Sequence, residues 1–432
     1  MEVFDLIIKN GSIVDPKSGT VKKGTIIIEG NKIKNIYPED YQCDSQEVDV
    51  IDATGKYVMP GFIDLHVHLR DPGLTYKEDI VTGANAAARG GVTTICAMPN
   101  TKPVVDTVET LNYVHDKASK EAKVRVKQLS AFTVNMDGKE LVDMEAMNKA
   151  GAVAFSEDGK SVMDINLYRD ALKKVADMNA LVMAHCEDKD LVGKGVLNEG
   201  IASEKYGVPG IPNSVEDVIT ARDIFLAGEL GARLHICHCS TKGTVELMRM
   251  AKRMGFNVTA EVCPHHFTLT DADITEADSN YKMNPPLRTE EDVRALIEGL
   301  VDGTMDCIST DHAPHAKEEK DKFFTEAPFG ITGLETSAAL TYTALVDTKL
   351  MDIVEMSKKM SYNPAKVLGI SEEFGYIEEG AIADIAIFDA EAEWEVKAEE
   401  FASKSTNTPY TGKVLKGRVT HTLVNGKLVY EL

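Results

Sequence analysis

The two ends of the chain share a pattern of short apolar runs separated by turn dipeptides. These runs are Leu6–Ile8, Thr25–Ile28 and Lys32–Ile36 near the start, and Ala383–Phe388, Val414–Val419 and Thr422–Tyr430 near the end. Asn-Gly or Gly-Asn pairs at residues 10–11, 30–31 and 425–426 are typical of hairpin turns. The pattern predicts that residues 1–58 and 378–432 together build one small β-sandwich.

Between these ends, apolar β-branched runs alternate with longer amphipathic stretches. Eight runs predict strands: Phe62–His68, Val92–Met98, Val124–Val134, Ala152–Asp158, Ala180–Cys186, Arg233–Ser240, Asn257–His265 and Asp306–Asp311. The stretches between them predict helices, among them Tyr76–Arg89, Thr107–Glu121, Ile165–Met178, Ser214–Leu230, Thr241–Met254 and Glu290–Leu300. This α/β alternation over about 250 residues is typical of a (β/α)8 TIM barrel, which we expect at residues 59–377. A doubly wound sheet shares the alternation, but no G-x-G-x-x-G sequence follows these strands.

Composition narrows the class of protein. The 432 residues include 47 Lys and Arg against 69 Asp and Glu, a formal net charge of −22. We therefore expect neither nucleic acid nor an anionic membrane as a partner. No apolar run approaches the ~20 residues of a membrane-spanning helix, and the first five residues lack the features of a signal peptide. Cysteines inside apolar runs predict reduced thiols and a cytoplasmic location; these are Cys96, Cys186, Cys237, Cys239 and Cys307.

The first predicted strand of the barrel carries the clearest chemistry. Asp64, His66 and His68 follow one another at a spacing of two, which predicts that all three project from one face. Two imidazoles on one face can bind a single divalent metal. An ordinary pair of strand histidines would show the same spacing, so the motif alone does not decide. Arg70 has the same parity and adds a cation beside this face.

Histidine or carboxylate residues also end four other predicted strands. Active sites of TIM barrels lie at the carboxyl ends of the strands. Besides the first strand, the ends that carry such residues contain Asp158, His185, His238 and Asp311. Five strand ends that converge on one face predict a metal centre.

The other histidines and cysteines have more ordinary interpretations. His235 lies three residues before His238, so strand parity predicts that it faces the outer helices as a hydrogen-bonded core residue. The same parity predicts that Cys237 and Cys239 face outward. The remaining histidines are expected in supporting or surface positions outside the ligand set: His115, His265, His266, His312 and His421.

Five motifs, in this order, resemble the bacterial dihydroorotases of the amidohydrolase superfamily. They are His66–Gly73, Met98–Thr101, His185–Glu187, Asn284–Arg288 and Asp311–His315. The resemblance covers nearly the whole chain, including Ala383-Asp384 and Val424-Asn425-Gly426 in the terminal strands. Each motif alone is moderately specific, whereas their order is highly specific.

The resemblance implies a site with two zinc ions. The ligands would be His66, His68 and Asp311 for one ion, and His185 and His238 for the other. Much of the superfamily bridges its metals with a carboxylated lysine on the fourth strand, whereas this chain has Asp158, as one branch of the dihydroorotases does. Lys160, two positions on with matching parity, leaves a modified lysine open as an alternative bridge.

The resemblance further implies reversible hydrolysis of the cyclic amide of (S)-dihydroorotate to N-carbamoyl-L-aspartate, in de novo pyrimidine biosynthesis. The metal would activate a water for attack on the ring carbonyl, and Asp311 would accept its proton and pass it to the departing nitrogen. Arg70 would bind the substrate carboxylate through its planar guanidinium. The other expected contacts are Asn100 and His315 at the carboxylate, and Asn284 with the backbone of Phe329 and Gly330 at the ring.

Several of these residues have alternative roles. Arg70 could instead pair with Asp71 or Glu78, and Asn100 could simply belong to a Pro-Asn turn. Residues 316–328 are charged and lack a clear period, which predicts a loop that closes over the site or stays solvated. Its most charged part, Lys317–Lys322, predicts a mobile loop.

Two other functions compete with this one. A sister cyclic amidase, dihydropyrimidinase or allantoinase, is the nearest, but dihydropyrimidine has no carboxylate for Arg70 to bind. A non-catalytic dihydroorotase-like assembly subunit would be expected to have lost metal ligands, and all six are present here. The sequence predicts a small-molecule substrate and leaves open both a homodimer and an association with aspartate carbamoyltransferase.

Overall fold

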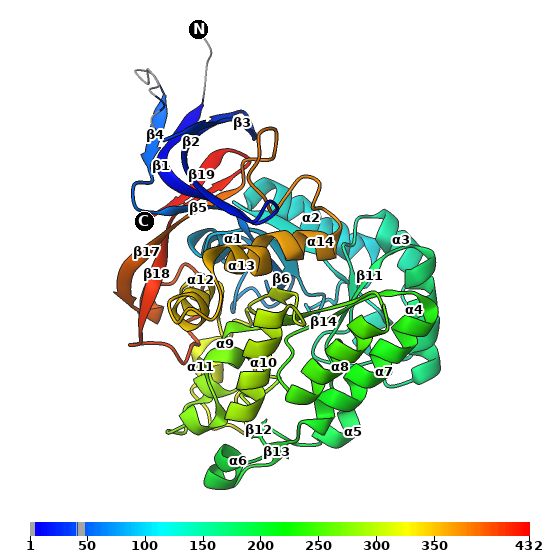
Figure 1. The fold of residues 1–432 in the computed structure, drawn as a ribbon. Helices are drawn as coiled ribbons and strands as arrows, with labels where there is room; N and C mark the ends of the chain where they lie inside the picture. The colour runs from blue at the N-terminus through cyan, green and yellow to red at the C-terminus, as the bar shows by residue number, and fades with distance from the viewer. Residues whose placement is uncertain (1–4, 40, 42–47) are drawn as a thin grey trace.

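A computed structural model describes residues 5–39, 41 and 48–432, which have a mixed α/β fold. The strands of the two termini gather at one end of the molecule, and parallel strands with surrounding helices make up the rest (Figure 1). Within the described ranges, we find no helix with the length and hydropathy needed to cross a membrane. The prediction about a signal peptide concerns residues 1–4 above all, which lie outside the described part of the chain.

The terminal strands form one hydrogen-bonded sheet. They are β1 (Leu6–Asp15), β2 (Thr20–Glu29), β3 (Lys32–Pro38), β4 (Asp49–Asp52), β5 (Tyr57–Pro60), β17 (Ile385–Glu395), β18 (Val414–Val424) and β19 (Lys427–Glu431). Their order is β19-β18-β17-β5-β1-β2-β3, and β4 also pairs with β1. Because β17 pairs antiparallel with β5, for example Ile385 with Pro60, both ends of the chain build this sheet together, as predicted.

Two of the three predicted hairpin turns are confirmed. Gly30 and Asn31 join β2 to β3, and Asn425 and Gly426 join β18 to β19. The third prediction is wrong, because residues 10 and 11 lie inside β1, where the pairing with β2 shifts register between Ile8 and Gly11. The positive φ of Asn10, 62°, therefore belongs to a bulge within a strand and not to a turn.

The eight runs predicted as strands form parallel strands at the expected places, most of them shorter. They are β6 (Phe62–Val67), β7 (Val92–Ala97), β8 (Arg125–Gln128) with β9 (Ser130–Ala131), β10 (Phe155–Ser156), β11 (Leu181–Ala184), β14 (Arg233–Ile236), β15 (Val258–Val262) and β16 (Cys307–Ile308). They pair in the orders β6-β7-β8 and β9-β10-β11-β14-β15-β16. An isolated parallel pairing of Val67 with His312 joins the segment after β16 to the end of β6.

The six predicted helices are confirmed to within a few residues. They are α1 (Ile80–Arg89), α2 (Val108–Glu121), α4 (Ile165–Asp177), α7 (Ser214–Leu230), α8 (Lys242–Arg253) and α10 (Glu290–Asp302). Helix α1 begins four residues later than predicted, because the Asp79 side chain accepts from the backbone N–H groups of Val81 and Thr82 and caps the helix there.

Short elements were missed because few of them span enough residues to show a period. They are α3 (Met144–Lys149), α5 (Lys189–Val192), α6 (Ile201–Tyr206), α9 (Pro264–Thr268), α11 (Lys317–Lys320), α12 (Ser337–Thr341), α13 (Ile353–Ser357), α14 (Asn363–Leu368) and the paired strands β12 (Leu197–Asn198) and β13 (Gly210–Ile211). Several of them lie in the segments that follow the carboxyl ends of the parallel strands.

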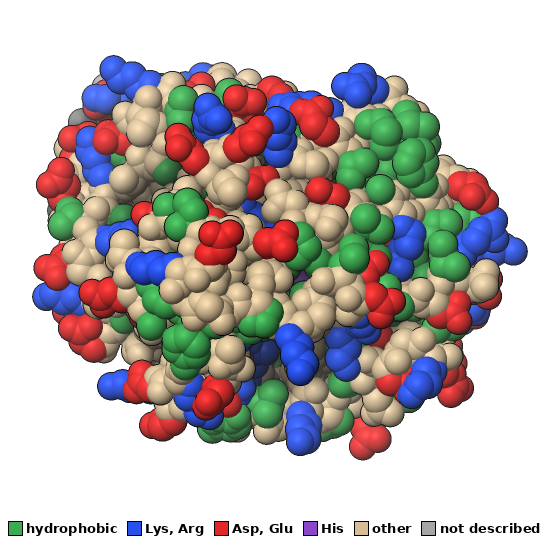
Figure 2. Space-filling model, turned by 90° about the horizontal axis from the view of Figure 1, so that it is seen from below, with side chains coloured by type: hydrophobic (Ala, Val, Ile, Leu, Met, Phe, Trp, Pro, Cys, Tyr) green, Lys and Arg blue, Asp and Glu red, His purple; other side chains and the backbone are tan. Residues whose placement is uncertain are grey.

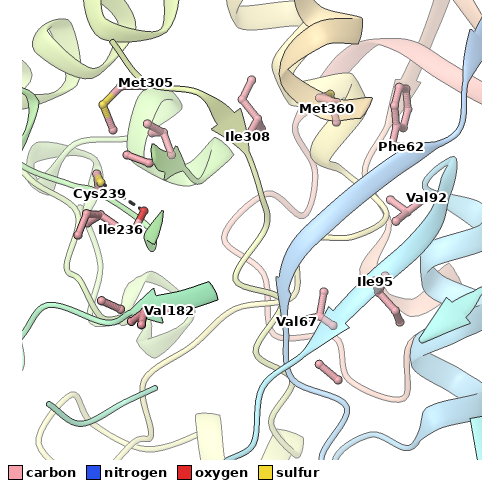
Figure 3. Close-up of a cluster of buried hydrophobic side chains, with 14 of the residues drawn as sticks. Phe62, Val67, Val92, Ile95, Val182, Ile236, Cys239, Met305, Ile308 and Met360 are labelled. Atoms are coloured by element: carbon pink, nitrogen blue, oxygen red, sulfur yellow. Dashed lines mark hydrogen bonds between the residues drawn. The ribbon is translucent and has the colours of Figure 1, made fainter. Parts of the chain in front are cut away.

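Apolar side chains cover both faces of the parallel strands. Val182 on β11 packs in one cluster with Phe62, Val92, Ile236 and helix residues (Figure 3). Its neighbours Leu181 and Met183 pack in a second cluster. Because successive residues of a strand point to opposite faces, the strands are buried on both sides, as is typical of parallel sheets.

Arg125 joins the parallel strands to the terminal sheet. From β8, its guanidinium contacts the side chains of Asp384 and Asn425. Asp384 is buried, and burial raises the pKa of its carboxyl group while Arg125 opposes this change. The pair is therefore a buried contact between segments that lie far apart in the sequence.

We expect the substitution Arg125→Met to lower the free energy of unfolding by about 1–3 kcal/mol, because it leaves the Asp384 carboxylate buried without its cation. Urea unfolding followed by circular dichroism measures the change. Arg169→Met is the matched control: its partner Glu229 is 58% exposed and Arg169 is 45% exposed, so the change should stay within about 0.5 kcal/mol. Equal effects of the two substitutions would contradict the role given to Arg125.

Candidate functional site

One group of candidate metal ligands surrounds Asp311. His66 lies on β6 and His68 directly follows it, and their Nε2 atoms lie 3.5 and 3.1 Å from Asp311 Oδ1. The same Nε2 atoms lie 3.2 and 3.5 Å from the carboxylate oxygens of Asp158. Burial alone would raise the pKa of Asp311, but the hydrogen bond to His68 and the neighbouring imidazoles lower it to about 2. The carboxylate is thus held ionised, as a metal ligand must be.

A second group of candidate ligands approaches the same carboxylate of Asp158. His185 Nδ1 and His238 Nε2 are 2.9 Å apart, and they lie 3.7 and 3.6 Å from Asp158 Oδ1. The six predicted ligands are therefore brought together, and the carboxylate of Asp158 contacts histidines of both groups. Positive φ angles of 33° at His238 and 48° at Asp311 show that the backbone departs from the strand conformation where it presents these ligands.

Unpartnered polar atoms support a metal at this position. His66 Nε2 and Asp158 Oδ1 are buried and lack hydrogen-bond partners within the described chain. Leaving a buried polar atom unsatisfied is costly, and coordination of a cation would satisfy both atoms. Groups of three potential ligands, His66-His68-Asp311 and His66-Asp158-His238, each lie close enough together to share an ion. The donor set of imidazoles and carboxylates therefore fits a divalent metal.

Glu261 on β15 orients His66 from behind. Its carboxylate oxygens lie 3.0 Å from His66 Nδ1 and 3.0 Å from His235 Nε2. Burial opposes ionisation of Glu261, but the two histidines lower the pKa of its carboxyl group well below the usual range. An ionised Glu261 accepts a hydrogen bond from the protonated Nδ1 of His66, which leaves Nε2 free to face the metal position.

The positions of His235 on β14 and of Cys237 just after it correct the strand-parity argument. His235 is a hydrogen-bonded core residue as expected, but it contacts Glu261 behind the ligands and does not face the outer helices. Cys237 also lies beside His66 and Glu261 and does not face outward. Asp64, expected on the face of His66 and His68, is buried and accepts hydrogen bonds from the backbone N–H groups of His66 and Thr310.

Several other predictions can now be decided. Lys160 donates to the carbonyl of Met136 at 2.8 Å, so it is not at the metal position and the modified-lysine alternative is wrong. Cys239 packs in the cluster between strands and helices, as predicted. The other histidines lie outside the six-ligand set, as expected: His265, His266 and His312 are buried, and His115 and His421 are partly buried.

A pocket of about 200 Å³ opens beside the candidate ligands. It is lined by His68, Asp158, His185, His238 and Asp311 and by all six residues predicted to contact substrate, namely Arg70, Asn100, Asn284, His315, Phe329 and Gly330. On the face of the molecule drawn in Figure 2, histidine shows only as a small area recessed near the centre, in agreement with the burial of this cluster.

Arg70 faces this pocket without a carboxylate partner among the described residues. Its Nε donates to the carbonyl of Pro314 at 3.2 Å, and its Nη2 lies 3.3 Å from His315 Nε2. The alternative partners are engaged elsewhere, since Asp71 binds Lys117 and Glu78 contacts His312. A buried guanidinium with donors to spare can bind an anion.

Asn100 and Asn284 contact the ligands or their neighbours. Asn100 Oδ1 lies 2.9 Å from His68 Nδ1, and its Nδ2 donates to Asp158 at 3.1 Å. Asn284 donates to Glu187, whose carboxylate lies 3.7 Å from His185 Nε2. Sequence reasoning missed the supporting roles of Glu187 and Glu261. A carboxylate within or just after an apolar strand run was the available signal for both.

The charged stretch Lys317–Lys322, predicted as a loop, is in part helical. Residues 317–320 form α11, and the side chains of Lys320 and Phe324 are buried. Burial, together with the nearby charge of Lys282, lowers the pKa of Lys320 to about 7. Most of the run is exposed, and Lys320 is the exception, because the carbonyl groups that bind it cannot be seen in the sequence.

Solved structures of similar proteins define the class. The chain superposes on an L-hydantoinase (dihydropyrimidinase) from Arthrobacter aurescens with a TM-score of 0.90 and 27% identity, over 99% of this chain and 96% of that one. A dihydropyrimidinase from Brevibacillus agri gives a TM-score of 0.86 at 25% identity, over 98% and 95%. The fold is that of an amidohydrolase-type protein.

Sequence relatives define the family within this class. A family model described as dihydro-orotase-like matches residues 55–244. Proteins named dihydroorotase from Clostridioides difficile and Clostridium acetobutylicum are 49% and 47% identical, over 98% and 99% of this chain and 99% of each relative. The chain belongs to the dihydroorotase family.

The contact between Glu261 and His66 gives a testable prediction. We expect Glu261→Gln to weaken metal binding by about 10–100-fold, because a neutral amide no longer fixes the proton on His66 Nδ1. Metal retained after dialysis against graded chelator concentrations measures the affinity. Glu216→Gln is the matched control, since Glu216 is also buried but contacts Ser240 and Thr241. Equal metal loss from both variants would contradict the role of Glu261.

Proposed function

We propose that this protein is a dihydroorotase, which hydrolyses the cyclic amide of (S)-dihydroorotate reversibly to N-carbamoyl-L-aspartate in pyrimidine biosynthesis. The position of Arg70 carries the proposal. The guanidinium of Arg70 has no carboxylate partner among the described residues and lies beside the candidate metal ligands. A substrate with a carboxylate next to its amide ring would lie there. The names of the relatives agree with this activity.

We infer that the parallel strands close a (β/α)8 barrel over residues 59–377, with the terminal strands folded as a sandwich from residues 1–58 and 378–432. The Val67–His312 pairing supports closure, because it links the two ends of the strand order. The apolar cluster of Ile26, Ile28, Ile385 and Leu423 supports a sandwich, since it gives the terminal sheet a core of its own. We also propose a cytoplasmic location, which fits the free, buried cysteines of the described residues.

We propose two zinc ions as the metals. His66, His68 and Asp311 would hold one ion, and His185 and His238 the other, with Asp158 between them. The separations of about 3–4 Å between the nitrogen and oxygen atoms of each group suit ligands that converge on a cation. When bound, such a metal lowers the pKa of a coordinated water toward 7 and polarises the amide carbonyl.

Asp311 would act as the proton carrier. Its low pKa keeps the carboxylate ready to accept the proton of the attacking water. The same group would then deliver that proton to the ring nitrogen as the carbon–nitrogen bond breaks. In the reverse direction, Asp311 would take the proton of the carbamoyl nitrogen as it attacks the carboxyl carbon, and would pass it to the departing hydroxide, which leaves as water while the ring closes.

The remaining lining residues would select the substrate. Arg70 and His315 lie together on one side of the pocket, where they would hold the carboxylate, with Asn100 nearby. Asn284 and the backbone of Phe329 and Gly330 would face the ring. His315 Nδ1 lies 3.2 Å from Lys77 Nζ, and Lys77 pairs in turn with Glu319 at 3.0 Å.

A hydantoinase or dihydropyrimidinase activity is the second candidate, because solved structures with those names share the fold over nearly the whole chain. Turnover of dihydroorotate, dihydrouracil, hydantoin and allantoin by one metal-loaded preparation separates the candidates. Preference for any of the last three would refute the proposal. A non-catalytic subunit would turn over none of them.

The proposed role of Arg70 predicts a binding defect. We expect Arg70→Met to raise the KM for dihydroorotate by about 10–100-fold with a smaller change in kcat, since the carboxylate is bound in both the ground and transition states. Arg70→Lys, which keeps the charge but not the planar fork, should give an intermediate KM in the same steady-state assay. An unchanged KM in Arg70→Met would remove Arg70 from the substrate site.

The proposed role of Asp311 predicts a defect in the chemical step. We expect Asp311→Asn to lower kcat by about 10²–10⁴-fold, because an amide cannot accept the proton of the attacking water. Metal content must be measured on the same sample, so that loss of metal is separated from loss of the base. A variant that keeps its metal and its normal activity would refute the proton-transfer role.

A further inference from the structure

The side chain of Asn407 lies between two segments that line the pocket. Asn407 is 4% exposed. Its Oδ1 accepts a hydrogen bond from the backbone N–H of His315 at 3.1 Å. Its Nδ2 donates to the carbonyl of Ala313 at 3.1 Å and to the carbonyl of Gly330 at 3.0 Å. One side chain from the C-terminal part of the chain thus ties the His315 segment to the Gly330 segment.

The chemistry of these contacts requires a primary amide in this orientation. One neighbour is a donor and two are carbonyl acceptors, so one acceptor atom and two N–H groups are needed in a fixed arrangement. The backbone carbonyl of Asn407 adds a further link, because it accepts from the N–H of Thr332 at 2.9 Å. A buried side chain whose hydrogen bonds are all satisfied restrains the backbone around it.

The Gly330 carbonyl is also held by Lys320. The Lys320 ammonium donates to the carbonyls of Lys282, Pro328 and Gly330 at 3.1, 3.0 and 3.0 Å. At Gly330 the φ angle is 131°, and a Cβ atom would lie 2.6 Å from the Cβ of Ala313. The chain at Ala313 and the chain at Gly330 therefore lie so close together that only glycine fits at position 330. The hydrogen bonds of Asn407 connect the two segments at this point.

The position of the His315 imidazole depends on how the His315 and Gly330 segments are aligned. Its Nε2 lies 2.8 Å from the carbonyl of Phe329, and its Nδ1 lies 3.2 Å from Lys77 Nζ. An ammonium group only donates, so Nδ1 accepts and Nε2 carries the proton. A shift of the Phe329–Gly330 backbone would break this hydrogen bond and move the imidazole relative to Arg70.

We propose that Asn407 is a positioning residue for substrate binding, which aligns His315 with the Phe329–Gly330 backbone and so shapes the subsite for the substrate carboxylate. The inference rests on the proposed function, in which Arg70 and His315 bind that carboxylate. The hydrogen bonds of Asn407 within the described chain reach backbone groups and no metal ligand. Its loss therefore affects binding and leaves the metal and the chemical step in place.

Asn407→Asp tests this role with almost no change in shape, because it turns a carboxylate oxygen toward the carbonyls of Ala313 and Gly330. We expect the KM for dihydroorotate to rise about tenfold or more, with kcat within about threefold of the parent and the metal content unchanged. The inhibition constant of orotate, a planar carboxylate that resembles the substrate, should rise in parallel. Steady-state kinetics and metal analysis of one preparation give these values.

Asn363→Asp is the matched control. Asn363 donates to the carbonyl of Asp306 at 2.8 Å, at the amino end of β16 and so at the opposite end of the strands from the ligands. We expect this variant to keep the parent KM and inhibition constant. An unchanged KM in Asn407→Asp, or an equal rise in Asn363→Asp, would overturn the inference.

Lys320→Met provides a second route if Asn407→Asp does not accumulate as folded protein. It removes the other donor to the Gly330 carbonyl without touching the C-terminal segment, so a raised KM supports the inference and an unchanged KM overturns it. The activity of the parent protein distinguishes a failure of this inference from a failure of the proposed function. A parent that does not turn over dihydroorotate refutes the function, whereas an active parent with an unaffected Asn407→Asp variant refutes only the role of Asn407.

Discussion

The carboxylate of Asp158 is buried beside four histidines, and the site depends on how the negative charge of this carboxylate is neutralised. Burial raises the pKa of a carboxyl group, whereas the imidazoles around Asp158, His66 foremost, lower it well below the ordinary range. Unpartnered atoms remain on Asp158 and His66 even so. Coordination of a cation would satisfy a buried cluster of this kind.

The sequence allowed the ligands to be predicted because their types and order are local. Histidine and aspartate at successive strand ends required only the strand runs to be recognised, and His185, His238 and Asp311 were found in this way. The parity argument failed at His235 and Cys237 for a physical reason. Strand β14 ends at Ile236, and the positive φ of His238 breaks the alternation of side chains. His238 therefore faces the same inner side as His235 and Cys237.

Contacts between distant parts of the chain could not be predicted. Glu261 meets His66 across 195 positions, and Asn407 meets His315 across 92. Neither residue belongs to a motif that indicates its partner. Lys320 shows the same limit, since a lysine in a charged run is expected in water and here donates to three carbonyls. The α/β class could be predicted from periodic patterns of apolar residues. The hydrogen bonds that position the site residues depend on how distant segments of the chain pack together.

The position of Asn407 also bears on how the protein is made. The segment around it is fixed by Glu335 and Glu78, whose carboxylates accept from the backbone of Ala402, Ser403 and Lys404. During synthesis, every metal ligand leaves the ribosome before residue 407 does. The residue that ties the His315 segment to the Gly330 segment is therefore added only in the last tenth of the polypeptide, after all the candidate ligands.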